Sequence, residues 1–430
     1  MRIGYYAHHH GSGHCRQADK LAALLPDDVR EQLIVFTSLE ADTYRFTSIN
    51  EQQIMRLYPE DERRDDVLTG RAGEYWKPAG LHYSPVGNID IQRRSHQILD
   101  AIHHYDIDLM IIDVSAEIAM LCRVASVPYL YVRLPGIRDD TAHLETFAGA
   151  LALLAPYPQS LESTHTTGWV CDKTLYLDFI YTRNTQSHTR EDFIDILTRL
   201  DTDKRFSTTV QSTKPESTYD PEPMISAMPI ATTQTIITII KGYGGHQSID
   251  DKLPELRGLL PQALIISLGP IDDDKRGYVD ISAQVDDVTP YINHSDYLIM
   301  ACGLNAVAQA YHYATPLIVI PDDRPHQEQV VMAQALLAQD KALNWEQFKA
   351  LMIAQHGKSE CFDTMSQAMS HAPEKQYRVP VSNDDIDETN TLMAAQAFMN
   401  SLCAYPSTKL WFENWLLTKI KSKPESTHKQ

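Results

Sequence analysis

Residues 296–336 constrain the fold most, because they form two successive units of strand, loop and helix. The apolar run 297–302 ends at Gly303, as a buried parallel strand would. A helix is predicted over 305–314, and it ends there because the residue before Pro316 disfavours helical dihedral angles. The first unit therefore predicts a strand that leads through a glycine loop into a helix.

The second unit repeats this pattern. The apolar strand 317–320 stops at Pro321, and a polar loop leads to a helix over about 328–339. Doubly wound α/β folds bind nucleotides where neighbouring parallel strands open into loops and helix N-termini, since free backbone N–H groups favour phosphate there. The stretch predicts an α/β fold with a phosphate-binding sheet edge.

The spacing of eight residues in this stretch is more specific than its architecture. They are Gly303, Gln309, Pro316, Pro321, Glu328, Gln329, Ala333 and Leu336. Their order, G-x5-E/Q-x6-P-x4-P-x6-E-Q-x3-A-x2-L, resembles the sugar-nucleotide-binding half of GT-B glycosyltransferases, especially family 28 and its relatives. The resemblance implies two doubly wound Rossmann-like domains that face each other across a cleft.

The resemblance also implies a donor site. In that family a glycine loop contacts the diphosphate, an acid in the next helix binds ribose hydroxyls, and a later acidic or amide pair binds the sugar. The implied residues are Gly303, Leu304 and Asn305 for the diphosphate, Gln309 for the ribose, and Glu328 and Gln329 for the sugar. The family usually has Glu where Gln309 stands, and an amide accepts a hydrogen bond but lacks the charge.

The N-terminal loop is rich in histidine. It lies at 8–14, between a predicted strand at 2–7 and a predicted helix at 15–25. By itself G-x-G is also typical of a plain turn, but neutral imidazoles can accept a proton from a sugar hydroxyl. A metal site in the loop is the alternative, although adjacent histidines rarely share a metal without an acidic partner. No metal is predicted.

The order H-x-x-G-x-G-H-x-R in this loop resembles the N-terminal motif of the same family. The resemblance implies that His14 is the catalytic base. It also implies acceptor contacts from the rest of the motif, namely His10, Gly11, Gly13 and Arg16.

Two later segments of the first half carry polar side chains after buried strands. The strand 109–112 opens into D-V-S-x-E, and the strand 127–132 opens into R-x-P-G-x-R-D-D-x-x-H. Both segments resemble a bacterial subgroup of GT-B proteins. The predicted acceptor-binding residues here are Asp113, Ser115, Arg133, Arg138 and Asp139. Helix capping by Asp113 or Ser115, and a local ion pair at Arg138, are the structural alternatives.

A second glycine loop follows the β-branched strand predicted at 235–240. Glycines allow a backbone to approach phosphate, and Lys241 or His246 can add positive charge. The predicted donor-binding residues of this loop are Gly242, Gly244 and Gly245. Their place resembles the first strand and loop of GT-B donor domains.

The length of 430 residues allows two domains, each with its own core. The predicted organisation is an acceptor-side Rossmann-like domain at 1–165, a connecting segment at 166–234, a nucleotide-sugar-binding Rossmann-like domain at 235–400, and a C-terminal helix and tail at 401–430. Ser, Thr and Pro recur over 203–234, which predicts a flexible linker. A long loop is expected at 61–90, and a helix at 251–260.

Composition restricts the partners and the compartment. A net charge of -19 argues against nucleic acid, which needs a basic footprint. No apolar run reaches the roughly 20 residues of a membrane helix, although peripheral membrane contact stays open. No signal peptide is visible, and the six cysteines are scattered without a C-x-x-C pair. A cytoplasmic protein is expected.

These observations favour transfer of a hexosyl group from a nucleotide-diphosphate sugar, with UDP as the expected nucleotide, to an acceptor hydroxyl. The resemblance implies inversion at the sugar without metal or cofactor. A sugar-nucleotide 2-epimerase and a non-catalytic sugar- or partner-binding protein are the alternatives. The epimerase has the same fold and donor loops as these transferases. The non-catalytic protein is considered because Gln309 stands where the family usually has Glu. The identity of the acceptor is not encoded in any of these motifs.

Overall fold

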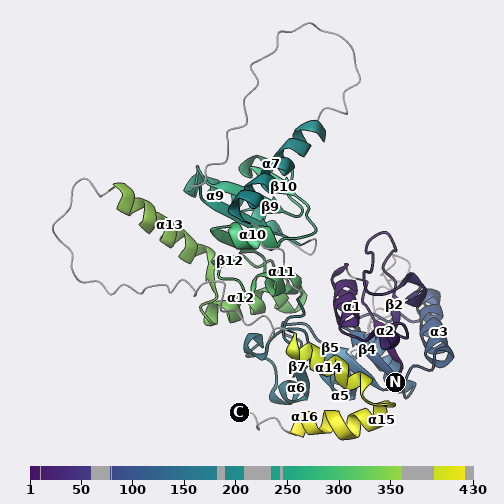
Figure 1. Cartoon of the computed structure of the whole chain (residues 1–430). Helices are drawn as coiled ribbons and strands as arrows, with labels where there is room; N and C mark the ends of the chain where they lie inside the picture. Colours follow the sequence, from purple (N-terminus) through teal and green to yellow (C-terminus); the bar gives the residue numbers. More distant parts are fainter. Residues whose placement is uncertain are drawn as a thin grey trace, which may run out of the picture. The chain divides into compact units, whose positions relative to one another are not determined.

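Figure 1 shows the computed structural model of the chain, which describes residues 1–9, 11–59, 78, 80–181, 189–207, 234–242, 246–360 and 392–421. The chain divides into two compact units, each with its own parallel sheet. Unit 1 comprises Met1–Tyr181, Pro325–Ala335 and Asp387–Gln430, and unit 2 comprises Thr182–Arg324 and Leu336–Ile386.

Unit 1 contains a seven-stranded sheet in the order β3-β2-β1-β4-β5-β6-β7, in which all paired strands are parallel. Its strands are β1 (Ile3–Tyr6), β2 (Ile34–Thr37), β3 (Ile54–Arg56), β4 (Leu109–Asp113), β5 (Tyr129–Val132), β6 (Leu153–Ala155) and β7 (Thr174–Tyr176). The strand order reverses between β1 and β4. In open α/β sheets ligands bind beyond the carboxyl ends of the strands at such a reversal.

Helices cover both faces of this sheet because successive strand residues point to opposite sides. They are α1 (Gly13–Ala23), α2 (Asp27–Arg30), η1 (Glu51–Gln53), α3 (Ile89–His104), α4 (Ala116–Val124), α5 (Thr141–Gly149), η4 (Gln159–Leu161), α6 (Gly168–Lys173), η6 (Pro325–Gln327), the first residues of α12 (Glu328–Ala338), α14 (Met393–Cys403), α15 (Thr408–Trp411), the π-helix η8 (Phe412–Leu416) and α16 (Leu417–Lys421). The C-terminal helices, yellow in Figure 1, bury Phe398 and Trp411 in the same core cluster as Tyr5. Ile98 and Ile118 pack with Tyr6 in the other cluster.

Unit 2 contains a six-stranded parallel sheet in the order β10-β9-β8-β11-β12-β13. Its strands are β8 (Ile236–Ile240), β9 (Leu264–Leu268), β10 (Ile281–Ala283), β11 (Tyr297–Met300), β12 (Leu317–Val319) and β13 (Ala342–Asn344). Here the order reverses between β8 and β11. Two doubly wound α/β units are therefore present, as the sequence predicts.

The helices of unit 2 flank this sheet. They are α7 (Arg190–Ser207), α8 (Gln247–Asp250), α9 (Leu253–Leu259), η5 (Arg276–Tyr278), α10 (Thr289–His294), α11 (Leu304–Ala310) and α13 (Trp345–Glu360). Phe193 and Leu197 of α7 pack in one core cluster with Ile266 and Tyr291. Trp345 and Phe348 of α13 pack in the other.

The structure differs from the predicted elements in several places. The helix expected at 251–260 is α9, which spans Leu253–Leu259 with a proline in its first turn, and a separate short helix, α8, precedes it at Gln247–Asp250. Residues 203–207, expected to begin a flexible linker, are the last residues of α7. The rest of that linker and most of the expected loop at 61–90 lie outside the described residues.

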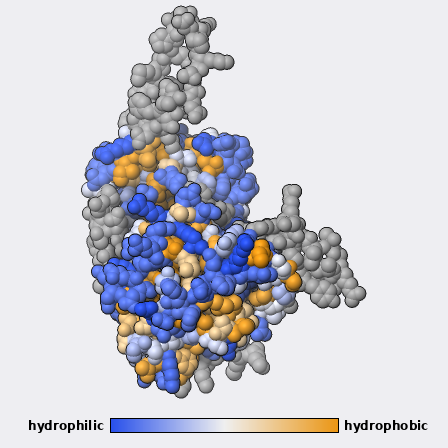
Figure 2. Space-filling view, turned by 90° about the vertical axis from the view of Figure 1, so that its right-hand side faces the viewer, coloured by the Kyte–Doolittle hydropathy of each residue, from blue (hydrophilic) through white to orange (hydrophobic). Residues whose placement is uncertain are grey.

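Among the helices that the structure describes, none is both long and apolar enough to cross a membrane. The face seen in Figure 2 is largely hydrophilic, and its hydrophobic residues form separate small patches.

Candidate functional site

The sheet of unit 1 brings His14 to Asp113. His14 lies in the first turn of α1, directly after the loop that follows β1, and Asp113 is the last residue of β4 beside it. The Nδ1 atom of His14 lies 3.1 Å from Oδ1 of Asp113. The Tyr5 hydroxyl donates a hydrogen bond of 3.1 Å to Oδ2 of the same carboxylate. The pair leaves Nε2 of His14 as the ring nitrogen available for proton exchange.

The electrostatic surroundings of His14 favour its protonated form. Burial alone would lower the pKa of the imidazole, because a charged ring loses hydration. The Asp113 carboxylate outweighs burial, so the net shift is upward from 6.5. Asp113 is 1 % exposed, which keeps water from screening this attraction.

The turn after β4 has an unusual backbone. Val114 has a φ of 67°, a left-handed conformation that a β-branched residue rarely adopts. Ser115 follows as the N-cap of α4, and its hydroxyl accepts a hydrogen bond of 3.3 Å from the Ile118 amide. The capping alternative thus describes Ser115 in the structure, and an acceptor contact from its side chain stays a prediction. Strained backbone of this kind is frequent beside active sites.

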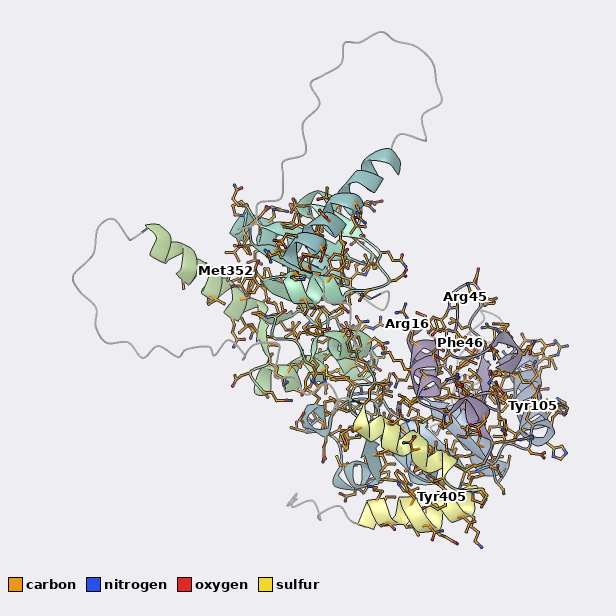
Figure 3. The ribbon with its side chains drawn as sticks, in the orientation of Figure 1. Arg16, Arg45, Phe46, Tyr105, Met352 and Tyr405 are labelled. Carbon is orange, nitrogen blue, oxygen red and sulfur yellow. The ribbon has the colours of Figure 1, made fainter. Side chains whose placement is uncertain are left out.

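The other residues of the N-terminal loop lie beside His14. Gly11 is exposed with a φ of 84°, so the turn needs a residue without a Cβ, and Gly13 begins α1. Arg16 on α1, labelled in Figure 3, is exposed, and its guanidinium carbon lies 5.9 Å from the centre of the Tyr44 ring. His10 lies outside the described residues. Acceptor contacts from these residues stay predictions.

Arg133 is buried and already paired. Its guanidinium binds both carboxylate oxygens of Glu162, and its Nε donates to Oγ1 of Thr174 at 3.0 Å. The Glu162 carboxylate also accepts from the hydroxyl groups of Tyr157, at 3.2 Å, and Tyr176, at 2.9 Å. Only 2 % of Arg133 is exposed, so the structure gives this side chain a role in the core. Acceptor binding by Arg133 stays a prediction.

Arg138 pairs with another predicted binding residue. Its guanidinium forms an ion pair with Glu328, at the start of α12, and its Nη1 lies 2.9 Å from Nε2 of His143. Glu328 is predicted to bind the donor sugar, and Arg138 the acceptor. Gln329 beside Glu328 is buried, whereas Asp139 beside Arg138 is exposed. These assignments stay predictions. The ion pair that the structure gives Arg138 joins it to Glu328, far along the chain, and not to the adjacent Asp139 or Asp140 of the structural alternative.

A close backbone approach holds Pro325–Gln327 against the loop after β5. The Ile137 amide donates a hydrogen bond of 2.7 Å to the His326 carbonyl oxygen. A Cβ at Gly136, whose φ is 117°, would lie 2.6 Å from that oxygen, so only glycine fits there. His326 itself has a φ of 59°. Residues from two distant parts of the sequence are thereby fixed next to each other within unit 1.

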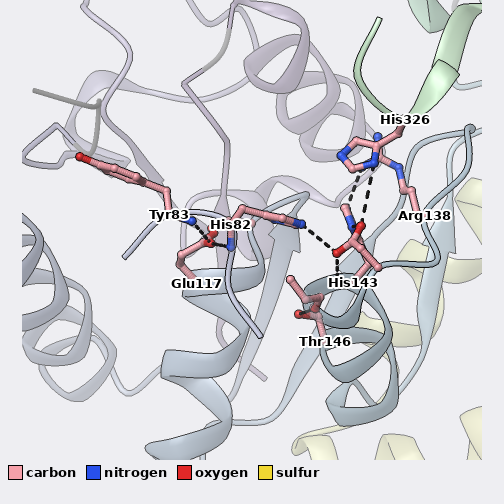
Figure 4. Close-up of polar contacts among 10 residues, drawn as sticks. His82, Tyr83, Glu117, Arg138, His143, Thr146 and His326 are labelled. Carbon is pink, nitrogen blue, oxygen red and sulfur yellow. Dashed lines mark hydrogen bonds and ion pairs between the residues drawn. The ribbon is translucent and has the colours of Figure 1, made fainter. Parts of the chain in front are cut away.

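Three histidines surround the Asp140 carboxylate in this region (Figure 4). Nε2 of His82 lies 3.1 Å from Oδ1 of Asp140, whereas Nδ1 of His143 lies 2.6 Å and Nδ1 of His326 3.9 Å from Oδ2. The Asp140 carboxylate also accepts from the His143 amide and so caps α5.

Charge and burial set the protonation of this cluster. Burial, assisted by the Arg138 cation, lowers the pKa of His143 to about 3 and also lowers the pKa of His326. Burial acts to raise the pKa of Asp140, but the hydrogen bonds from His143 outweigh it and hold that pKa well below its usual range. The cluster at neutral pH therefore contains an ionised carboxylate beside neutral imidazoles of His143 and His326.

The glycine loop of unit 2 is only partly described. Gly242 is exposed, and Gly244 and Gly245 lie outside the described residues. Lys241 is buried, and its Nζ lies 2.5 Å from Oδ1 of Asp250 on α8. Burial lowers the pKa of Lys241, although the Asp250 carboxylate opposes the shift. Its ammonium group thus links the end of β8 to α8.

The glycine that follows β11 begins a helix as predicted. Gly303 is the N-cap of α11, and its carbonyl oxygen accepts from the amides of Ala306 and Val307, both at 3.0 Å. Leu304 and Asn305 form the first turn, and Gln309 lies half-buried on the same helix. The preceding Cys302 has a φ of 66°, the same kind of turn as Val114 makes after β4. Donor binding by these residues stays a prediction.

The sequence did not point to His82 or His326 as site residues. Each lies in a polar loop without a motif, and only the folded chain places them beside Asp140. The R-D-D-x-x-H run was the available signal, because an acid and a histidine three residues apart at a helix start face each other.

Comparisons with known proteins identify the fold. No protein-family model matches the sequence, and no curated protein matches it. The chain is similar to the solved structure of MurG from Acinetobacter baumannii, at 11% identity and a TM-score of 0.50, over 84% of this chain and 91% of that one. The GT-B architecture that the sequence resemblance implies is therefore confirmed at the level of the fold.

Two further solved structures show lower similarity. One is UDP-GlcNAc 2-epimerase from Neisseria meningitidis bound to UDP-GlcNAc, at 11% identity and a TM-score of 0.48, over 94% of this chain and 100% of that one. The other is spinosyn rhamnosyltransferase SpnG complexed with thymidine diphosphate, at 13% identity and a TM-score of 0.46, over 83% and 92%.

Proposed function

We propose that the chain is a glycosyltransferase that moves a hexosyl group from a UDP-sugar to an acceptor hydroxyl. The observation that carries this proposal is the pairing of His14 with Asp113 beside the carboxyl ends of β1 and β4. A histidine held by a buried carboxylate is suited to general base catalysis, and the reversal of strand order is where such sheets bind ligands.

In this reaction Nε2 of His14 accepts the proton of the acceptor hydroxyl. The hydroxyl oxygen attacks the anomeric carbon of the sugar at the same time. The bond from that carbon to the diphosphate oxygen breaks, and the nucleoside diphosphate leaves with the electron pair. Attack opposite to the leaving group inverts the anomeric centre. Asp113 fixes the orientation of the ring and stabilises the imidazolium that forms.

The donor would be held by the residues that the sequence resemblance names. Backbone N–H groups beside Gly303 and in the loop at 242–245 would bind the diphosphate, and Gln309 would accept a hydrogen bond from the ribose. Glu328 and Gln329 would bind sugar hydroxyls. None of these steps needs a metal or a cofactor, because the base is an imidazole and the leaving group is stabilised by backbone dipoles.

The proposal predicts a specific dependence on pH. A base must be unprotonated, so kcat/KM should fall as the pH drops through the raised pKa of His14, with the acid limb centred above 6.5. Asp113→Asn removes the charge that raises this pKa, while burial remains. In that variant the acid limb should move to lower pH and the plateau should fall. An unchanged acid limb would show that another group titrates.

Nucleotide binding tests the donor site. Isothermal titration calorimetry with UDP, GDP and dTDP is expected to show binding of UDP to the wild type. Gln309→Ala should raise the Kd roughly 2- to 12-fold, as expected for one neutral hydrogen bond. The control is Gln334→Ala, because Gln334 is an exposed residue of α12 and should leave the Kd unchanged. Equal affinities in all three proteins would remove Gln309 from the donor site.

A further inference from the structure

We propose that His82, Asp140 and His326 form a binding site for a divalent transition-metal ion of the Zn²⁺ type, with His143 as the residue that positions the Asp140 carboxylate. One ligand atom from each of these four residues lies within 4.8 Å of the others. In a tetrahedral zinc site with bonds of about 2.0–2.2 Å, ligand atoms lie about 3.3–3.6 Å apart. Nε2 of His82 lies 3.1 Å from Oδ1 of Asp140, and Nδ1 of His326 lies 3.9 Å from Oδ2, so each nitrogen lies near that spacing from one of the two carboxylate oxygens.

The kind of ligand selects the ion. Two imidazoles and one carboxylate suit Zn²⁺ and similar first-row ions, and this set occurs with an open fourth position. Mg²⁺ and Ca²⁺ prefer a shell of oxygen ligands, of which the Asp140 carboxylate alone is present among these side chains. A transition metal is therefore the class of ligand that fits.

Hydrogen bonding assigns His143 its separate role. The Arg138 guanidinium can only donate, so Nε2 of His143, 2.9 Å from Nη1, accepts. The ring proton then lies on Nδ1, which donates to Oδ2 of Asp140 at 2.6 Å. Neither ring nitrogen keeps a lone pair for a metal. His143 instead orients a ligating carboxylate, as groups behind metal ligands commonly do.

The three ligand residues are held in place by further hydrogen bonds. The backbone amides of His82 and Tyr83 both donate to Oε1 of Glu117, at 2.6 and 2.9 Å (Figure 4). The Asp140 carboxylate is fixed as the N-cap of α5. The His326 carbonyl oxygen is bound by Ile137, which fixes its left-handed backbone. Such preorganisation lowers the entropic cost of gathering ligands from three distant segments.

The Arg138 cation beside the cluster acts against a bound cation, and the Asp140 carboxylate acts in its favour. Arg138 is the positive group next to the cluster, and its charge is balanced by the ion pair with Glu328. The Asp140 carboxylate remains to balance the metal. A bound ion would tie the segments around His82 and His326 to the start of α5.

Calorimetric titration of the EDTA-treated full chain with ZnCl₂ tests the site. The wild type is expected to bind one more equivalent of Zn²⁺ than His82→Ala or His326→Ala. Both side chains are about a third exposed, at 38% and 30%, so the variants should fold. Far-UV circular dichroism and urea unfolding in EDTA verify this. His103→Ala, which removes an exposed histidine of α3, is the matched control and should bind as the wild type does.

The role of His143 has its own readout. His143→Gln keeps an amide that can donate to Asp140. This variant should still bind the additional equivalent of Zn²⁺, with an affinity for the ion roughly 10- to 100-fold lower than that of the wild type. Replacing Zn²⁺ by Co²⁺ should give visible absorption bands that persist in His143→Gln and vanish in His326→Ala. Loss of the equivalent in His143→Gln would overturn the positioning role.

The site itself would be overturned by two results. One is an unchanged number of Zn²⁺ equivalents in both His82→Ala and His326→Ala. The other is loss of the equivalent only in His9→Ala or His246→Ala, which would move the metal to the N-terminal loop or to the cluster of His246, Asp250 and Asp272. Neither result depends on transferase activity.

Discussion

Replacing His14 by alanine should lower kcat by roughly 10²- to 10⁴-fold, the contribution typical of a positioned general base. The loss should appear in the chemical step, because the acceptor hydroxyl would have to ionise without a nearby imidazole. The Kd for the nucleotide should stay unchanged, because the proposed donor contacts lie elsewhere in the chain. Initial rates at saturating substrates, with calorimetry on the same samples, measure both quantities.

His103→Ala is the control for this experiment, since it removes an exposed histidine of α3 and should keep the wild-type rate. A His14→Ala variant with full activity would exclude His14 as the base. A variant with lost nucleotide binding would show that His14 acts on the donor instead.

Replacing Arg133 by methionine should lower the free energy of unfolding by about 3–5 kcal/mol. Methionine fills much of the space of the arginine side chain but leaves Glu162 ionised with its main partner gone. The Glu162 side chain is only 10% exposed, so water cannot compensate fully. Urea unfolding followed by tryptophan fluorescence measures the loss.

Arg30→Met is the matched control for this ion pair. Arg30 pairs with Asp27 at the surface, where the two side chains are 30% and 84% exposed, so its loss should cost at most about 1 kcal/mol. The double variant Arg133→Met/Glu162→Leu should recover much of the loss, because no buried charge is left without a partner. Equal stabilities of wild type and Arg133→Met would show that the network does not support the core.

The parts of the fold that the sequence predicts are those with local signals. β1 with its glycine loop and α1, and β11 with Gly303 and α11, were all visible as an apolar run, a glycine and a helix without Gly or Pro. The short strands β3, β6, β7 and β13 were not predicted. Each has three residues, too few to show a period, and it pairs with a neighbour that the sequence does not identify.

In the candidate site, too, the sequence shows single residues, whereas their contacts depend on the fold. The sequence identifies His14 and Asp113 by their positions at the ends of strands, but it predicts separate roles for them, a catalytic base and an acceptor contact. Their pairing depends on β1 and β4 being neighbours, which only the sheet order reveals. Arg133 is a residue for which the sequence suggests a role that the structure does not support directly. Its type and its position after a strand suggest ligand binding, yet its guanidinium forms hydrogen bonds with Glu162 and Tyr176, both later in the chain. The cluster at Asp140 joins three segments for the same reason.

The most direct measurement is the turnover of a UDP-sugar panel with and without hydroxyl acceptors, followed by chromatography and mass spectrometry. We expect UDP and a new glycoside to form in equal amounts when an acceptor is present, and the donor to stay largely unchanged when no acceptor is added. Conversion of the donor to an isomer without acceptor would contradict transfer and support a 2-epimerase. If neither turnover nor nucleotide binding occurs, the chain is a non-catalytic protein with this fold.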